Sequence, residues 1–306
     1  MMKVASDRLS VDIAAPGEAY QGSRYDWTGF VTQVTLDGRH TFCGVESPVP
    51  GVGSGGLGLC NEFGIVTPLG YEGTPPGQPF PKLGVGLLTR LDSEAYQFFR
   101  PYPVQPCHFA VWQDDAAIKI VADPLPCVGL AARLEKTMRV DGNALVIGYQ
   151  LANTGTKPLI TEEYAHNYLC LDTAPIGPDY ALTLPAEATI HLLVDQQRRA
   201  EEGTPPLLSA QGPTLRLNYA PKDALLLDAA AGAPAETAPS GSWWQVTHRE
   251  SGLGVRETTS FAWERFALYG TPHCLCPEAY LRLSLLPGQS QAWFRRYTFS
   301  ADGSRS

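Results

Sequence analysis

The sequence predicts an all-β protein, a large antiparallel β-sandwich. Short runs rich in aromatic and β-branched residues recur along the 306-residue chain, and many alternate between apolar and polar positions as half-buried strands do. The 30 glycines and 26 prolines interrupt the chain often and leave little room for long helices. Tight polar turns between the runs favour an antiparallel meander.

The expected strands fall on both sides of a weakly patterned stretch, residues 195–240, which we predict to hold loops and short edge strands. Residues 1–20 contribute one or two strands. The strands expected after them lie at residues 30–36, 39–45, 82–88, 96–100, 108–112, 117–121, 130–140, 144–152, 157–172, 242–248, 254–260, 263–269, 275–285 and 291–299. No repeat or linker divides the chain. We therefore expect one domain over residues 1–300, a frayed tail at 301–306, and a ligand groove on a concave sheet.

The clearest hairpin is predicted at Asp37-Gly38, because tight hairpin loops need positive φ at both central positions. Residues 46–81 are rich in glycine and proline and lack the Gly-Lys-Ser/Thr ending of a phosphate-binding loop. We interpret them as long loops at one rim, where ligand contacts concentrate. Glu62, within them, is either such a contact or a solvated loop charge.

The strand at residues 157–172 carries the strongest functional signal. Alternation places polar and aromatic side chains on one of its faces: Glu162, Tyr164, His166, Tyr168 and Cys170. The opposite face carries Ala165, Asn167, Leu169 and Leu171. The first row is a poor hydrophobic core but a suitable wall for a polyhydroxylated ligand. Taken alone, His166 is more simply a half-buried, hydrogen-bonded histidine.

A second strand, at residues 275–285, favours a functional role for His166 over the simpler interpretation. Its leucines and alanine mark the core side, so Glu278 faces outward beside Tyr280 and Arg282. One histidine and one glutamate on comparable polar faces suit paired acid–base chemistry. Whether His166 and Glu278 face each other across a groove, at a separation that fits one ring of a ligand, therefore decides whether the pair forms an active site.

Composition limits the other possibilities. The formal net charge of −8 argues against nucleic acid or an anionic membrane as a partner. No apolar run is long enough to span a bilayer, and the first residues lack a signal-peptide core, so we expect a cytoplasmic location. The seven scattered cysteines are interpreted as free thiols. Cys274 and Cys276 are too close in sequence for a zinc half-site, so we expect no metal.

Several segments resemble the aldose 1-epimerase (galactose mutarotase-like) superfamily. Residues 153–159 (Asn-Thr-Gly-Thr-Lys-Pro-Leu) and 163–168 (Glu-Tyr-Ala-His-Asn-Tyr) are similar to the region of its catalytic histidine. Residues 276–280 (Cys-Pro-Glu-Ala-Tyr) and 286–299 are similar to its C-terminal segment, where a glutamate precedes the closing strands. Residues 24–29 and 82–86 look like N-terminal segments of a divergent branch.

The resemblance implies the supersandwich fold of that family and the interconversion of α and β anomers of a sugar. It implies His166 as the acid that protonates the ring oxygen and Glu278 as the base that deprotonates the anomeric hydroxyl, with no cofactor. The family's second histidine has no match here: His108 is nearest in chain order, but its neighbours differ. We expect the sugar contacts to come from other residues: Arg24, Trp27, Glu62, Lys82, Arg100, Tyr164 and Asn167.

The expected ligand is a monosaccharide or sugar derivative bound by a monomer or homodimer. A sugar phosphate stays open as a substrate. A carbohydrate-binding protein that has lost the chemistry is the main alternative, since fold does not fix function. A lyase or hydrolase ranks last, because hydrolases usually need two carboxylates and only Glu278 is well placed.

Overall fold

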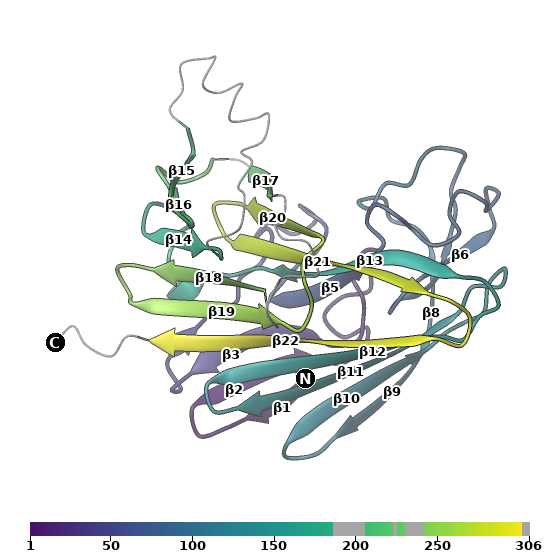
Figure 1. Ribbon diagram of the computed structural model, residues 1–306, viewed down its shortest axis with the longest axis horizontal. Coiled ribbons are helices and arrows are strands. Elements are labelled where there is room, and N and C mark those ends of the chain that lie inside the picture. The colour runs from purple at the N-terminus through teal and green to yellow at the C-terminus, as the bar shows by residue number, and fades with distance from the viewer. Residues whose placement is uncertain (186–205, 223–224, 230–241, 302–306) are drawn as a thin grey trace.

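Antiparallel β-strand makes up almost all the regular structure of the computed structural model, as the sequence predicts (Figure 1). The structure describes residues 1–185, 206–222, 225–229 and 242–301. Within these ranges the helical structure is the 3₁₀ turn η1 (Leu171–Thr173), and no helix could cross a lipid bilayer. The expectations for residues 195–205, 223–224 and 230–240 and for the tail beyond Ala301 lie outside the described residues.

The first sheet contains nine strands within the described ranges. In sheet order they are β1 (Met2–Ala5), β2 (Leu9–Ala14), β3 (Phe30–Leu36), β5 (Leu59–Phe63), β13 (Leu159–Asn167), β21 (Leu275–Leu285), β20 (Arg265–Gly270) and β17 (Leu225–Ala229), with β4 (His40–Thr41) paired to β3. The strand that carries His166 therefore lies in the middle of this sheet. The edge strand β17 falls in the weakly patterned stretch, where short edge strands are expected.

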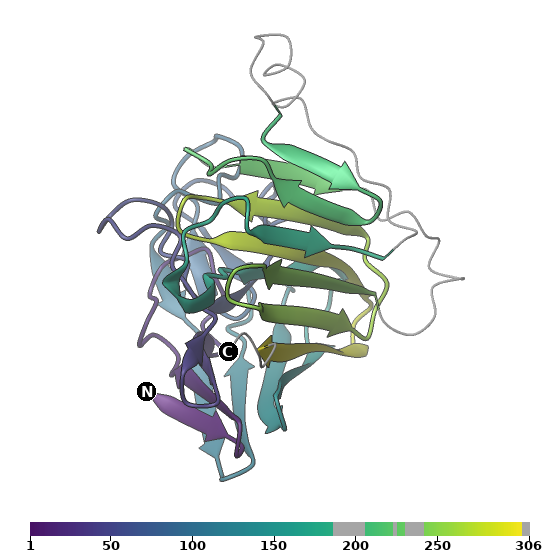
Figure 2. The ribbon, with the colours of Figure 1, turned by 90° about the vertical axis from the view of Figure 1, so that its left-hand side faces the viewer.

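The second sheet contains ten strands of the described chain. In sheet order they are β15 (Leu208–Gln211), β16 (Thr214–Leu217), β14 (Tyr180–Thr183), β18 (Trp243–His248), β19 (Leu253–Thr259), β22 (Ser290–Ala301), β12 (Ala144–Asn153), β11 (Ala132–Asp141), β10 (Ala117–Asp123) and β9 (His108–Gln113). Figure 2 shows β14, β18, β19 and β22 side by side. Consecutive strands β21 and β22 lie in different sheets, so the chain crosses between the two layers there (Figure 1).

A small third sheet holds β6 (Pro79–Lys82), β7 (Gly86–Thr89) and β8 (Val104–Pro106). The expected single strand at residues 82–88 is wrong, because the chain reverses at Leu83–Val85 and pairs Lys82 with Gly86. Gly84 has φ of 70°, and a Cβ there would lie 2.6 Å from the Cβ of Asp26, so only glycine fits this turn.

Other predictions of secondary structure need correction. The expected strand at residues 39–45 is reduced to β4, His40–Thr41, and the strand expected at residues 157–172 ends at Asn167, before turn η1. Residues 96–100 form a loop rather than a strand. In this loop Tyr96 stacks on Tyr102, with 5.5 Å between ring centroids. Residues 59–63, expected in a rim loop, form the central strand β5, and all five are buried. The hairpin after β3 is confirmed: Asp37 and Gly38 have φ of 53° and 64°, although Arg39 extends the loop to three residues before His40 pairs with Leu36.

The main hydrophobic core lies between the two large sheets. It collects inward-facing residues from both, such as Val34 of β3, Ile147 of β12 and Leu283 of β21, all nearly inaccessible to solvent. This core also contains charged side chains. Arg295 of β22 pairs with Glu163 of β13 at 2.8 Å and with Glu257 at 3.0 Å, and all three are fully buried. Such ion pairs link the two layers.

Candidate active site

The candidate site lies on the outer face of the first sheet, where four adjacent strands present polar side chains. The register places Tyr164 of β13 beside Glu62 of β5 on one side and Tyr280 of β21 on the other, and Tyr280 beside Arg265 of β20. Continuing the pairing of β13 with β21 by two residues sets His166 opposite Glu278. Because strand side chains alternate, these residues share one face.

A pocket of about 640 Å³ opens on this face, a size typical of small-molecule sites. Aromatic and charged side chains line it: Arg24, Glu46, Phe98, Phe99, Tyr164, His166, Tyr168, Arg265, Tyr269, Glu278 and Tyr280. Flat aromatic surfaces beside hydrogen-bonding groups suit a sugar ring.

Glu62 forms the buried centre of a charge network beneath the pocket. Its carboxylate pairs with Arg24 Nε at 2.8 Å and Lys82 Nζ at 3.3 Å and accepts a 2.7 Å hydrogen bond from the Tyr164 hydroxyl. Burial raises the pKa of Glu62, but Arg24, Lys82 and His166 outweigh it and hold that pKa well below its usual range. Glu62 is therefore ionised, and its interpretation as a solvated loop charge is wrong.

His166 is held by partners at both ring nitrogens. Nδ1 lies 2.8 Å from Glu278 Oε1. Nε2 lies 2.8 Å from the Tyr164 hydroxyl and 3.3 Å from Glu62 Oε2. The Tyr164 hydroxyl donates to Glu62 and so can accept from a protonated Nε2, whereas the Arg24 guanidinium, with Nη2 3.2 Å from Nε2, can only donate to an unprotonated Nε2. The hydrogen-bond geometry at His166 fits either protonation state, and the neighbouring charges decide between them.

The electrostatics favour the protonated form of His166. Burial and the Arg24 guanidinium lower its pKa, but the charge and hydrogen bond of Glu278 and the hydrogen bond of Glu62 raise it above its ordinary value of 6.5. Since the folded-state pKa is raised, this pairing stabilises the fold below about pH 6.5, and the contribution is lost as pH rises through the folded-state pKa.

An NMR titration of the imidazole provides a direct test. We expect the His166 midpoint to lie above 6.5, and to fall in Glu278→Gln, because that substitution removes the carboxylate charge that most raises the pKa. Glu264→Gln, at an exposed glutamate paired with Arg282, is the control and should leave the midpoint unchanged. If the titration midpoint of His166 did not change in Glu278→Gln, Glu278 would not be the group that raises the pKa of His166.

The contact between His166 and Glu278 is closer than a separation that fits one ring of a ligand. The two residues occupy opposite positions on neighbouring strands, and their side chains are in contact. No sugar ring therefore fits between them in this structure. Both still line the same pocket.

The seven residues expected at the sugar divide into two groups, four at or beneath the pocket and three elsewhere. Arg24 and Tyr164 line the pocket, and Glu62 and Lys82 support it from below, fully buried. Trp27, Arg100 and Asn167 lie elsewhere. Trp27 stacks on Phe109 and donates to the Gly22 carbonyl, Arg100 pairs with Asp92 at 2.6 Å, and Asn167 donates to the Pro277 carbonyl on the core side of β13.

Other pocket residues were not singled out from the sequence. Glu46 and Ser54 come from the glycine-rich loops: Ser54 accepts a 2.6 Å hydrogen bond from Arg24 Nη1, and Glu46 accepts from the Ser54 amide at 2.7 Å. Phe98 lies under the Arg24 guanidinium, 4.2 Å from ring centroid to Cζ. The prediction of rim loops at 46–81 identified the region of Glu46 and Ser54 but not the residues.

Comparison with solved structures assigns the fold to the galactose mutarotase-like class. A galactose mutarotase-like protein from Lactobacillus casei matches with a TM-score of 0.60 at 11% identity, covering 98% of this chain and 100% of that chain. A galactose mutarotase-like protein from Clostridium acetobutylicum matches with a TM-score of 0.60 at 10% identity, covering 98% and 94%. An aldose epimerase homologue from C. elegans matches with a TM-score of 0.54 at 13% identity, covering 98% of both.

No protein-family model and no curated protein sequence matches the chain. The solved structures confirm the predicted fold over nearly the whole chain. Identities this low show the fold alone.

Proposed function

We propose that this protein is a cofactor-independent sugar mutarotase, an isomerase that interconverts the α and β anomers of an aldose or aldose derivative. The observation that carries the proposal is the juxtaposition of His166 and Glu278 at 2.8 Å in an aromatic pocket on the central strands. The names of the structural neighbours from Lactobacillus casei and C. elegans support the same class of reaction.

The direct contact between the two residues is compatible with this chemistry. The oxygen that must gain a proton, the ring oxygen, and the oxygen that must lose one, the anomeric hydroxyl, are both bonded to C1. They therefore lie side by side, and an adjacent acid and base can address both. In this proposal C1 and its two oxygens insert at the His166 Nδ1–Glu278 Oε1 contact, while Nε2 stays anchored by Tyr164 and Glu62.

The proton transfers follow from these positions. Nδ1–H of His166 protonates the ring oxygen as its bond to C1 breaks, and Glu278 takes the proton from the anomeric hydroxyl as the C1 carbonyl forms. The open-chain aldehyde rotates about C1–C2, and the reverse steps close the ring on the other face. The raised pKa of His166 keeps the acid charged near neutral pH.

Polarimetry or NMR exchange on freshly dissolved α-anomers of several aldoses and their phosphates tests the proposal. We expect the protein to accelerate equilibration of at least one of them. A protein that binds a sugar without accelerating its anomerisation would be a carbohydrate-binding module, and the mutarotase proposal would fail.

A further inference from the structure

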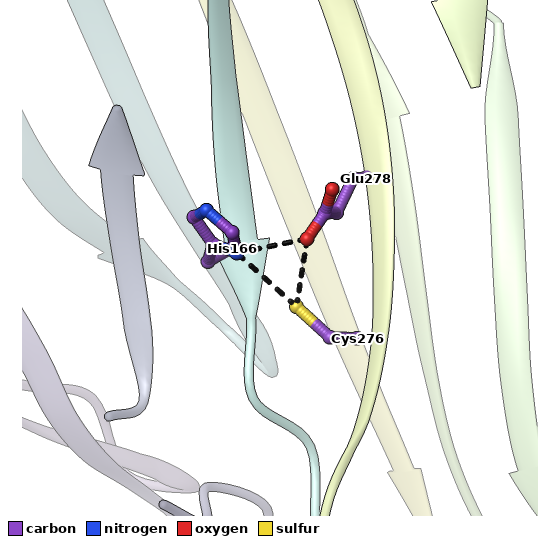
Figure 3. Close-up of side chains that lie close together, drawn as sticks. All are labelled: His166, Cys276 and Glu278. Atoms are coloured by element: carbon purple, nitrogen blue, oxygen red, sulfur yellow. Dashed lines mark hydrogen bonds and ion pairs between the residues drawn. The ribbon is translucent and has the colours of Figure 1, made fainter. Parts of the chain in front are cut away.

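A cysteine completes a cluster with the proposed acid and base. Cys276 precedes Glu278 by two residues on β21, so both side chains project from the same face toward His166 on β13, as Figure 3 shows. Cys276 Sγ lies 3.8 Å from His166 Nδ1 and 3.5 Å from Glu278 Oε1. The proposed anomerisation makes no use of this buried thiol.

The three atoms match the donor set and nearly the geometry of a zinc tripod. At the usual bond lengths of Zn²⁺ to sulfur, nitrogen and oxygen, tetrahedral ligand atoms are about 3.4–3.6 Å apart. The distances from Cys276 Sγ to His166 Nδ1 and to Glu278 Oε1, 3.8 and 3.5 Å, are close to this range. The His166–Glu278 distance of 2.8 Å must open by roughly 0.6 Å, a shift that a strand side chain accommodates by rotation.

The surroundings supply the outer-sphere contacts that orient metal ligands. Metal-bound histidines usually donate their other N–H to a carboxylate, a backbone carbonyl or water. His166 Nε2 lies 3.3 Å from Glu62 Oε2 and 2.8 Å from the Tyr164 hydroxyl, itself bonded to Glu62. The Tyr280 hydroxyl donates to Glu278 Oε2 at 3.0 Å, which leaves Oε1 directed at the cluster. His166 and Glu278 line the pocket, so a fourth coordination position opens into it.

We propose that His166, Cys276 and Glu278 form a binding site for a thiophilic divalent cation such as Zn²⁺, with its fourth position open to the pocket. The thiolate and the carboxylate balance the charge of the ion, and neutral His166 completes the tripod. The ion would occupy both the acid and the base, so it would block anomerisation reversibly. This last consequence rests on the proposed function; the binding site does not.

No spacing pattern in the sequence indicates this site, and we expected no metal. Metal-site spacing is recognised when ligands cluster along the chain, whereas His166 lies 110 residues before Cys276. The apparent pair, Cys274 and Cys276, does not converge on one point: Cys274 Sγ lies instead 3.4 Å from Thr271 Oγ1.

Cobalt is the spectroscopic probe, because a Co²⁺–thiolate bond absorbs in the near ultraviolet and tetrahedral Co²⁺ absorbs strongly in the visible range. Chelator-treated protein titrated with Co²⁺ should develop both features at one equivalent, and Zn²⁺ should displace the cobalt. The wild-type protein loaded with ¹¹³Cd should give an NMR signal typical of one thiolate ligand. This measurement decides the question even if a variant fails to fold.

Cys276→Ser should abolish the thiolate absorption and weaken Zn²⁺ binding by more than the roughly 10–100-fold that loss of an outer-sphere partner costs. Cys274→Ser, at an equally buried cysteine two residues away, is the matched control. It should retain both the thiolate absorption and the Zn²⁺ affinity of the wild type. A second cluster of possible ligands in the described residues, Asp179, His248 and Glu250, contains no thiol, so an ion there would give no thiolate band. Absence of the band in wild type, or its persistence in Cys276→Ser, would overturn the proposal.

Activity provides a separate readout. If the protein anomerises sugars, one equivalent of Zn²⁺ should suppress the reaction and a chelator should restore it. Undiminished activity with the thiolate site filled would overturn the inferred competition. If no sugar is anomerised, the proposed function fails, but the cobalt and cadmium spectra still decide whether the metal site exists.

Discussion

Replacing Glu278 with glutamine is expected to slow anomerisation by about 10²–10⁴-fold, the usual contribution of a positioned acid or base. Glutamine keeps the shape of the side chain and its contact with the Tyr280 hydroxyl but has no basic oxygen for the anomeric proton. It also removes the charge that most raises the pKa of His166, so less of the acid is protonated at neutral pH. Both effects act on kcat.

Sugar affinity should stay within roughly tenfold of wild type, because Glu278 acts chiefly on the reacting atoms. His166→Ala should reduce the rate by about the same 10²–10⁴-fold factor. Glu264→Gln makes the same chemical change at an exposed position and should leave the rate unchanged. The measurement is polarimetry at saturating sugar. A fully active Glu278→Gln variant would show that another group, such as the pocket residue Glu46, is the base.

Alternation along strands was enough to predict the polar faces of the site. It placed Tyr164, His166 and Tyr168 on one side of the chain and Asn167 on the other, and the structure has the same division in β13 and at Tyr168 just after it. It also placed Glu278 on the face opposite the leucines of β21, whose side chains are buried in the core. Such patterns can be predicted from sequence because successive side chains in a strand point to opposite faces of the sheet.

The contact between His166 and Glu278 could not be predicted in the same way. It depends on the pairing of two strands more than 100 residues apart, which local pattern does not specify. The strand β5 was missed for a different reason. Its buried Asn61 and Glu62 look like loop residues in sequence, and only their partners, Lys136 for Asn61 and Arg24 for Glu62, explain how a strand interior accommodates them.

Trp27 and Arg100 were expected to line or rim the same groove as His166, because the glycine-rich segment 46–81 is too long to be a simple connection. Each instead satisfies a local partner. The Trp27 indole N–H donates to the Gly22 carbonyl, and Arg100 forms a two-point pair with Asp92 within its own loop. Nearby protein groups of this kind compete with a ligand for the same side chain. Composition does not reveal whether the side chain pairs with the protein group or with the ligand.

The buried pairing of Arg295 predicts the largest effect on stability. Arg295→Met should lower the free energy of unfolding by about 3–5 kcal/mol, since removing one partner of a buried ion pair leaves uncompensated charge. Here Glu163 and Glu257 would both remain, fully buried, without the cation that lies 2.8 and 3.0 Å from them. Methionine fills much of the arginine volume, so the loss is electrostatic rather than a cavity.

The loss should depend on pH with a definite sign. Burial already raises the pKa of Glu163 despite the opposing charge of Arg295, and without that charge the pKa rises further. A carboxyl with a raised folded-state pKa takes up a proton on folding, so the variant loses stability as pH rises above about 4.3, the unfolded value for glutamate. Urea unfolding at about pH 5.5 and pH 8 should therefore show the larger deficit at the higher pH.

Arg296→Met is the matched control for this prediction. Arg296 is the next residue of β22 but points outward, where its pair with Asp141 at 3.0 Å is exposed on both sides. Exposed ion pairs contribute only about 0–1 kcal/mol, so this variant should unfold almost as wild type does at both pH values. If Arg295→Met were no less stable than Arg296→Met at pH 8, the buried pairing of Arg295 with the two glutamates would contribute no net stability, and the prediction would fail.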